Sequence, residues 1–200
     1  MLMQLMRAIA TGEETAPSRL LATSPSLATE AVERGATRQV STDFYFDEIA
    51  HYVYAGDTAL HLAAASHRPD VARDLVAAGA DVAARNRRGA QPLHYACDGG
   101  PAHPGWDPQA QAATVAYLIE ASADPNATDA SGVAPLHRAV RTRCAAAVNA
   151  LLDGGADPHR RNRSGSTPMK LALLTTGRGG SGSPQAKEQQ QEIVRLLELL

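Results

Sequence analysis

The chain has 200 residues, of which 44% are hydrophobic, and this content is enough for a sizeable core and excludes a disordered tail. Nineteen basic and 21 acidic side chains leave a net charge of -2, so the overall charge does not favour nucleic acid or a membrane surface as partner. The amino terminus lacks a signal-peptide pattern and no apolar run reaches about 18 residues, so we expect a soluble protein of the cytoplasm.

The amino-terminal stretch 2–23 is a degenerate copy of a pattern that returns later in the chain. Leu5, Ala8 and Leu20 have the spacing of the apolar residues in the complete units described below. Gly12 stands where a turn would join two helices. We therefore expect residues 2–23 to form a capping unit of two short helices.

Residues 24–55 are an insertion between this cap and the first complete unit. The segment DFYFDEIAHYVY within it holds five of the eight aromatic residues of the chain. We expect these residues to form a short helix that is capped near Thr42 or Asp43. Three of its side chains are expected to fill the junction between the cap and the first unit: Phe44, Ile49 and Val53.

Four related tetrapeptides begin the units that follow, namely TALH at Thr58, QPLH at Gln91, APLH at Ala134 and TPMK at Thr167, with spacings of 33, 43 and 33 residues. In such a unit threonine or an equivalent residue caps a helix, and proline takes the first helical position, where its missing N–H costs nothing. The units expected are 56–89, 90–132, 133–165 and 166–200. Their first buried apolar residues are expected to be Leu60, Leu93, Leu136 and Met169, each followed by an alanine three residues on.

A second helix in each unit carries a pair of apolar residues such as Leu75 and Val76. It is expected to end at a residue in the left-handed conformation, which is Gly79, Ser122 or Gly155 in the first three units. Short extended stretches then lead into the next unit through a turn closed by glycine: Gly89, Gly132 and Gly165.

Two of the units contain insertions between their helices. Ten extra residues interrupt the second unit, where a loop at 99–107 is expected before Asp107 and Pro108 restart a helix. About twelve extra residues interrupt the last unit, and its loop at 177–183 lacks the pattern of a phosphate-binding loop. We expect both loops to project from the same side, either as tolerated surface loops or as one ridge around the intervening unit.

A unit of 33 residues with a T-P-L-H start, two antiparallel helices and a turn resembles the ankyrin repeat. The resemblance rests on GDTALHLAAASHRPDVARDLVAAGADVAARNRRG, on GVAPLHRAVRTRCAAAVNALLDGGADPHRRNRSG and on the two interrupted units, roughly residues 54–200. It implies an all-α ankyrin-repeat solenoid of helix-turn-helix units with short β-turn or hairpin fingers, of a bacterial type with insertions in alternate repeats. The departures from the pattern weaken single helix caps: Ala59, Gln91, Ala134 and Lys170.

The seven histidines are the obvious candidates for catalysis or metal binding. Three recur at one position of the unit, where the resemblance implies that histidine braces the turn by hydrogen bonds: His61, His94 and His137. The remaining four show no ligand spacing: His51, His67, His103 and His159. Cys97 aligns with buried positions, whereas Cys144 near the end of a first helix is expected to be more exposed, and no nucleophile signature surrounds it. We therefore expect no enzyme, no cofactor, no metal site and two reduced thiols.

A local excess of arginine is visible instead, because residues 133–165 hold six arginines and two aspartates, and RNRR at 85–88 adds a second cluster. In ankyrin repeat proteins the turn tips and the exposed face of the first helices usually grip partners. The resemblance thus implies six partner-binding residues on a concave face: Arg85, Arg87, Arg88, Arg141, Arg161 and Arg163. Arginine suits this role because its planar fork matches carboxylates and phosphates. Arg87, Arg141 and Arg163 come from successive units, and we expect them to form one stripe.

We interpret the chain as a non-catalytic protein-binding module whose partner has an acidic surface. A nucleic-acid binder using the same arginines is the alternative, and a steep fall of affinity with salt would favour it. An enzyme that uses the loops 99–107 and 177–183 is a third possibility, and an arginine face that is merely solvated is the simplest one. We expect no membrane and no small-molecule substrate as partner.

Overall fold

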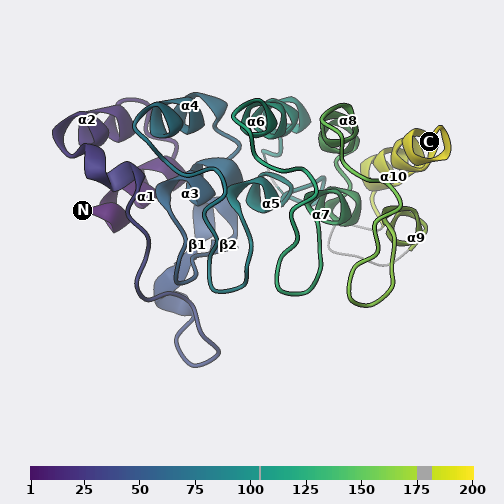
Figure 1. The fold of residues 1–200 in the computed structure, drawn as a ribbon, viewed down its shortest axis with the longest axis horizontal. Helices are drawn as coiled ribbons and strands as arrows, with labels where there is room; N and C mark the ends of the chain where they lie inside the picture. The colour runs from purple at the N-terminus through teal and green to yellow at the C-terminus, as the bar shows by residue number, and fades with distance from the viewer. Residues whose placement is uncertain (104, 175–181) are drawn as a thin grey trace.

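The computed structural model describes residues 1–103, 105–174 and 182–200. Ten α-helices in these residues form two rows that run from the amino terminus to the carboxyl terminus (Figure 1). The inner row contains α1 (Leu2–Ala10), α3 (Ala59–Ala65), α5 (Pro92–Ala96), α7 (Pro135–Thr142) and α9 (Pro168–Ala172). The outer row contains α2 (Ala16–Thr23), α4 (Pro69–Ala77), α6 (Pro108–Glu120), α8 (Ala145–Asp153) and α10 (Pro184–Glu198). The expectation of an all-α solenoid is confirmed.

Finger-like turns project from the edge of the inner row, below it in Figure 1. Backbone hydrogen bonds join neighbouring fingers, from Arg87 N to Ala55 O (2.8 Å), from Ala130 N to Arg88 O (2.8 Å) and from Arg163 N to Ser131 O (3.2 Å). Each unit is therefore tied to the next both through packed helices and through the fingers, as a repeat array requires.

A histidine at the third helical position braces the start of three inner helices. The Nδ1 atoms of His61, His94 and His137 accept from the backbone N–H of the residue that caps the helix, at 3.1, 3.2 and 3.2 Å. Their Nε2 atoms face backbone carbonyls at the start of the next unit, at 3.2, 3.0 and 3.1 Å. An imidazole that accepts at Nδ1 must carry its proton at Nε2, so all three rings are neutral and link neighbouring units.

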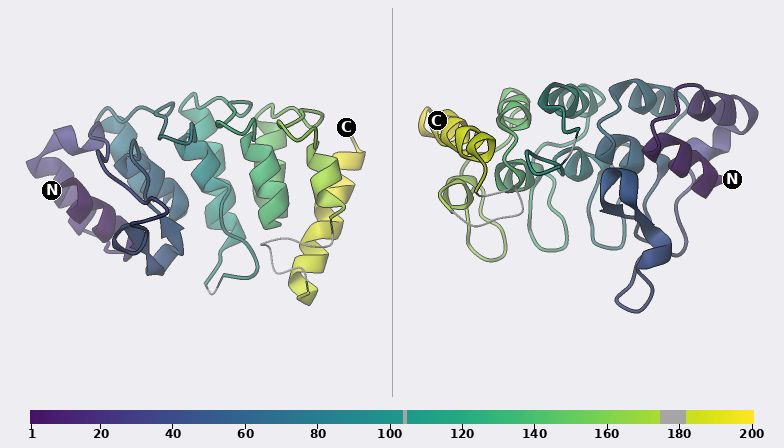
Figure 2. Two further views of the ribbon diagram at one scale, coloured as in Figure 1. Left: turned by 90° about the horizontal axis from the view of Figure 1, so that it is seen from below. Right: turned by 180° about the vertical axis from the view of Figure 1, so that it is seen from behind.

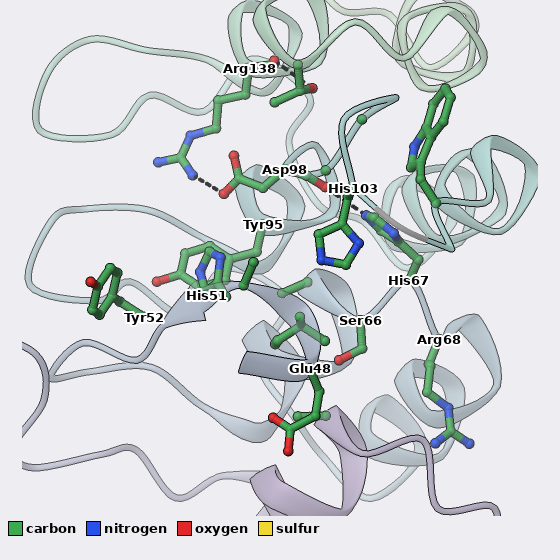
Figure 3. Close-up of a pocket in the computed structure, with 18 of the residues that line it drawn as sticks. Glu48, His51, Tyr52, Ser66, His67, Arg68, Tyr95, Asp98, His103 and Arg138 are labelled. Carbon is green, nitrogen blue, oxygen red and sulfur yellow. Dashed lines mark hydrogen bonds and ion pairs between the residues drawn. The ribbon is translucent and has the colours of Figure 1, made fainter. Parts of the chain in front are cut away.

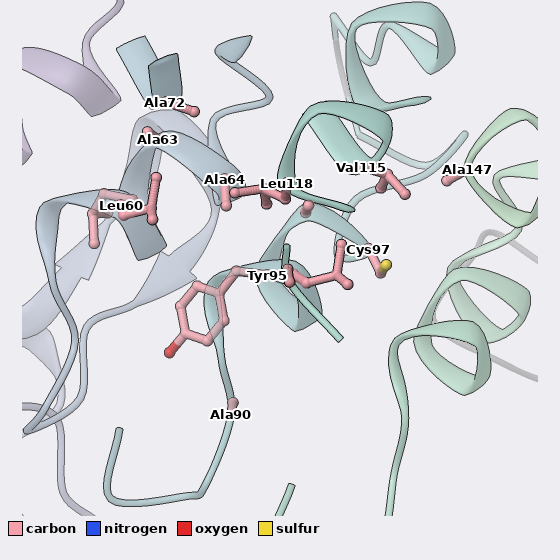
Figure 4. Close-up of a cluster of buried hydrophobic side chains, with 14 of the residues drawn as sticks. Leu60, Ala63, Ala64, Ala72, Ala90, Tyr95, Cys97, Val115, Leu118 and Ala147 are labelled. Atoms are coloured by element: carbon pink, nitrogen blue, oxygen red, sulfur yellow. The ribbon is translucent and has the colours of Figure 1, made fainter. Parts of the chain in front are cut away.

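Small side chains allow the inner and outer helices to approach closely. Figure 4 shows Ala64 of α3 beside Leu118 of α6 and Ala63 on the side of Ala72 of α4, within a core that continues to Ala147 of α8. The leucine of each complete unit, such as Leu60, is buried, and burying it contributes about 1.5–3 kcal/mol. The equivalent Met169 of the last unit is only half-buried, contrary to the expectation, because no inner helix of a following unit packs on α9 in the described residues.

The aromatic insertion is not a helix, and that expectation is wrong. Residues Thr42–Phe44 and Asp47–Ile49 form short 3-10 turns around β1 (Tyr45–Phe46), which pairs antiparallel with β2 (His51–Tyr52). Successive side chains point to opposite faces here, as in a strand: Phe46 is buried, while Tyr45 contacts Tyr52 across the hairpin with ring centroids 4.6 Å apart.

The same hairpin changes which insertion residues fill the core. Val53 is completely buried as expected, and Ile49 is half-buried against the core. Phe46 rather than Phe44 is the buried phenylalanine. Two backbone hydrogen bonds anchor the insertion to the first complete unit, from Val32 N to Asp57 O (2.8 Å) and from Gly56 N to Val32 O (2.8 Å).

Cys144 is also buried, contrary to the sequence-based expectation of an exposed thiol. It caps α8, and its Sγ accepts from the backbone N–H of Ala147 at 3.4 Å. Burial raises the pKa of the Cys144 thiol to about 11 and raises the pKa of the Cys97 thiol well above its usual value. Both cysteines are therefore packing residues in their thiol form.

The interrupted unit 90–132 has its loop where expected, between α5 and α6, and Figure 2 shows this loop extending beyond the helix ends. Asp107 caps α6 by accepting from the N–H groups of Gln109 (2.8 Å) and Ala110 (3.1 Å). Ser183 caps α10, while residues 177–181 of the other predicted loop lie outside the described residues. Within the described ranges, no helix is both long and apolar enough to cross a membrane.

Candidate functional site

A cavity with a volume of about 740 Å³ lies between the hairpin of the insertion and the loop that follows α5 (Figure 3). The ends of α1, α3 and α7 and the side chain of Tyr95 from α5 complete its walls. Its lining combines aromatic rings with histidine and charged side chains, so it suits a ligand that has both apolar and polar groups.

The floor of the cavity is a buried hydrogen-bonded network around Asp57. The Asp57 carboxylate accepts from the Tyr95 hydroxyl (2.9 Å), from Asn86 Nδ2 (2.9 Å) and from the backbone N–H of Tyr54 (2.6 Å). Burial, and next the charge of Asp57, raise the pKa of Tyr95 far above its usual value, so the phenol stays protonated and donates. The network fixes the Tyr95 ring, which forms one side of the site.

Arg138 of α7 stands at the opposite end of the site from Glu48 in the view of Figure 3. Its guanidinium binds Asp98 Oδ2 at 2.9 Å and Asp129 Oδ2 at 3.2 Å. Burial alone would lower the pKa of Arg138, but the two carboxylates outweigh burial and raise it. The arrangement ties the loop after α5 and the turn of the same unit to the helix of the next unit.

Three histidines that are far apart in the sequence line the cavity: His51, His67 and His103. The ring of His51 packs on Tyr95, with centroids 4.3 Å apart, and His67 Nε2 contacts the backbone carbonyl of Asp98 at 2.8 Å. Burial lowers the pKa of both His51 and His67 below the usual 6.5. Both are therefore neutral at pH 7.

The loop after α5 is held in place from several sides. Gln111 Nε2 donates to the carbonyls of Ala96 and Asp98, both at 3.1 Å, and Gln111 Oε1 accepts from Trp106 Nε1 at 2.7 Å. A Cβ added at Gly100 would lie 2.0 Å from the backbone oxygen of Thr142, so only glycine fits against α7 at this point. The loop is thus a fixed wall of the cavity.

Three residues that line the cavity each carry a buried polar atom that has no hydrogen-bond partner among the described residues: His51 Nε2, Ser66 Oγ and Arg138 Nε. They come from β2, from the carboxyl end of α3 and from α7. A buried polar group without a partner costs about 1–3 kcal/mol, so three of them around one cavity call for an explanation.

The six arginines proposed from sequence occupy different environments. Arg85 and Arg161 brace their own turns, because each donates to the carbonyl of the glycine four residues on, at 2.9 and 3.0 Å. Arg87 and Arg88 lie over the ring of Tyr54, with 5.3 and 5.0 Å from the guanidinium carbon to the ring centroid. Arg141 lines the cavity, and the side chain of Arg163 is exposed on the turn after α8.

The expected stripe is not a row of equivalent positions. Arg87 and Arg163 occupy equivalent places on their turns, but Ala130 takes that place in the unit between them, and Arg141 lies on α7 instead. Residues 133–165 also place less net positive charge on the surface than their count of arginines suggests. Arg143 is buried, donating to the carbonyl of Leu174 at 3.2 Å, and Arg138 is neutralised by its two carboxylates.

Sequence reasoning missed the residues that build the cavity: Glu48, His51, Tyr52, Tyr95, Asp98 and Arg138. The aromatic insertion was the one available signal, because so many rings in a polar segment are unusual. The pairing of His51 with Tyr95 and of Asp98 with Arg138 joins positions about 40 residues apart, and no local pattern encodes it. In the described part of the chain, no group of three or more His, Cys, Asp or Glu side chains could hold a metal ion.

Comparisons with known proteins agree with the repeated architecture. The family model described as "Ankyrin repeat" matches residues 55–87 and 88–130, and the model described as "Ankyrin repeats (many copies)" matches residues 118–172. The chain is also similar to neurogenic locus notch homolog protein 2 of Homo sapiens and to the protein of that name from Mus musculus. Each is 33% identical over 150 residues, which cover 63% of this chain but only 5% of the relative.

Proposed function

Because this chain belongs to the ankyrin repeat family, whose repeats are generally protein–protein interaction modules, we propose that it is a non-catalytic binder of an acidic protein surface. The arginines of the turns and of the concave face make the contact, and binding takes place in the cytoplasm. Since the chain spans about 5% of the length of the relatives it matches, the functions of those whole proteins are not transferred.

The arrangement of Arg87 and Arg88 around Tyr54 carries the proposal. Arg88 also donates from its guanidinium to the Tyr54 hydroxyl at 2.9 Å, and Arg87 donates to the carbonyl of Ala36. Both side chains remain exposed while they are held on the ring. Two guanidinium groups fixed in this way lose little side-chain entropy when a carboxylate binds, which favours recognition over simple solvation.

Arg141 and Arg163 extend the positive surface towards the carboxyl end of the array. Arg141 lies at the rim of the cavity and Arg163 on a turn that projects beyond it, so a partner lying along the concave face can reach both. An exposed arginine pair contributes about 0.2–1 kcal/mol, but one that the partner desolvates contributes about 2 kcal/mol or more.

Charge reversal tests this function. The triple variant Arg87→Glu, Arg141→Glu and Arg163→Glu changes the charge by six units while sparing the buried residues of the fold. Proteins captured from the native cell extract by the wild type should be lost with this variant. The matched control reverses three other exposed arginines, Arg19, Arg34 and Arg195, and should still capture them.

Two results would contradict the proposal. If the triple variant captures the partner with native affinity, the arginines only form a solvated face and do not bind it. Capture that disappears after nuclease treatment, with affinity falling steeply as salt is raised, would favour the nucleic-acid alternative.

A further inference from the structure

The cavity beside Tyr95 is not a product of the regular repeat. Its two walls are the hairpin of the insertion 24–55 and the loop after α5, both of which interrupt the 33-residue pattern. Both walls are fixed in place, the hairpin by the tilted contact of its Tyr45 and Tyr52 rings and the loop by Gln111 and the close approach of Gly100 to α7. The cavity is therefore a preformed feature of this chain.

We propose that this cavity is a binding site for an extended acidic segment of the partner protein. The inference rests on the proposed function, since it names where and how part of the acidic partner is held. Three polar atoms of its lining residues have no partner among the described residues and point to a ligand: His51 Nε2, Ser66 Oγ and Arg138 Nε.

These three atoms are held ready for a ligand. The His51 ring is packed on Tyr95, and the two terminal nitrogens of Arg138 are bound by Asp98 and Asp129, whereas its Nε–H has no partner among the described residues. Ser66 is fixed at the end of α3, where its backbone N–H donates to Leu62 O at 2.9 Å. A ligand that pairs with such groups removes a desolvation cost that the free protein already bears.

The chemistry of the three groups selects a hydrogen-bond acceptor. Arg138 Nε–H can only donate, the Ser66 hydroxyl can donate, and His51 Nε2 can donate in one of its tautomers. Asp98 and Asp129 already neutralise Arg138, so the positive charge open to a ligand comes from Arg88 and Arg141 on the cavity lining, and a carboxylate is favoured beside these two arginines. Tyr52, which is 39% exposed, offers an apolar surface for a neighbouring side chain.

The placement of the groups requires a ligand of several residues. In Figure 3 Arg138 lies at one end of the cavity, His51 beside Tyr95 lies between, and Ser66 lies towards Glu48 at the other end. Only an extended segment can reach all three elements. Glu48 repels acid at its own end, and Asp98 and Asp129 do so at Arg138, so the segment should carry its Asp or Glu beside Arg88 and Arg141, a neutral acceptor near Arg138 Nε and an uncharged or basic residue near Glu48.

Random linear peptides displayed on phage provide the probe. Selection on the full chain should enrich peptides that contain Asp or Glu beside an apolar residue. Their affinities are then measured by fluorescence anisotropy for wild type and for two variants, His51→Phe, which keeps the ring on Tyr95, and Ser66→Ala. His159→Phe and Ser164→Ala are matched controls at exposed positions that do not line the cavity.

Each cavity variant should weaken peptide binding about fivefold to tenfold, and the double variant more. The melting temperature of the free protein should stay the same or rise, because each change removes a buried atom without a partner. The controls should bind like the wild type. A merely structural role for His51 and Ser66 would instead lower the melting temperature and leave peptide affinity unchanged.

Three outcomes would overturn the inference: unchanged affinity in the double variant, selected peptides without acidic residues, or no selected peptides at all. If the double variant still captures the natural partner while the Arg87, Arg141 and Arg163 triple variant does not, the acidic-surface function stands and only the cavity site falls. If neither change affects capture, the function itself fails.

Discussion

Acid should destabilise this protein through the histidines that link its units, and His94 offers the sharpest test. Its Nδ1 accepts from the backbone N–H of Gln91, so a second ring proton would face that donor and break the contact. Burial, and next the charge of Arg138, lower the pKa of His94 from 6.5 to about 4. In the unfolded chain the same ring regains its ordinary pKa.

The size and sign of the effect follow from this difference. Between pH 6.5 and about 4 the unfolded chain binds a proton at His94 that the folded chain excludes. Folding stability from this group is therefore complete above the unfolded pKa and falls as the pH drops towards the folded one. A shift of about 2.5 units corresponds to a loss of about 3 kcal/mol.

Urea unfolding followed by far-ultraviolet circular dichroism, repeated from neutral pH to about pH 4, measures the loss. The variant His94→Gln is the control, because its amide oxygen can accept from Gln91 N and its amide nitrogen can donate to Val133 O without titrating. It should be less stable than the wild type at neutral pH by about 1–2 kcal/mol. Its stability should then fall by about 3 kcal/mol less on acidification.

Parallel pH dependences for wild type and His94→Gln would refute the reasoning. The other histidines with a lowered pKa, His61 and His137 among them, contribute equally to both curves and cancel in the comparison. Burial would raise the pKa of Asp129, but its hydrogen bonds and Arg138 outweigh burial and lower it, so acid weakens this contribution in both proteins alike and it also cancels.

Three further changes test the packing. Phe46→Ala should lower the free energy of unfolding by about 3–5 kcal/mol because Phe46 is buried, whereas the half-buried Phe44→Ala should cost clearly less, and equal losses in urea titrations would contradict the hairpin. Gly100→Ala should displace the loop after α5 and shift the fluorescence of Trp106. Gly182→Ala is the control, because its added Cβ would meet nothing within 4 Å. An unaltered fluorescence spectrum for Gly100→Ala would contradict a fixed loop. Leu199 and Leu200 are 83% and 62% exposed, so Leu199→Glu with Leu200→Glu should reduce weak self-association or partner docking through the carboxyl end. A wild type that stays monomeric at all concentrations in ultracentrifugation, and that binds no partner through this end, would contradict the prediction.

Much of the architecture was predictable because the contacts of a repeat lie within one unit or between neighbouring units, at the same positions each time. The 33-residue spacing, the proline at the first helical position and the alanine three residues after the leucine each describe a contact within a unit or with its neighbour. His61, His94 and His137 could be assigned a structural role for the same reason, since one position does one task in every unit. Even Ser122 was expected in the left-handed conformation, which it adopts with φ 74° in place of glycine.

The residues that tertiary structure alone decided are those without an equivalent in another unit. The insertion 24–55 has no second copy, so its aromatic pattern could not distinguish helix from hairpin, and Phe44 was chosen where Phe46 is buried. Cys144 is buried because α8 begins on it, a contact that its place at the end of a helix did not reveal.

The arginines show that a residue's place can be predicted from the sequence while its contacts cannot. Sequence placed Arg85, Arg87 and Arg161 on turns, yet only the folded chain shows that Arg85 and Arg161 donate to their own turns while Arg87 lies on Tyr54 of the insertion. The cavity arises in the same way. Stacked units bring an insertion and a loop against the same helices, and this places Asp98 on Arg138 and His51 on Tyr95. The spacing of these residues along the chain does not predict either contact.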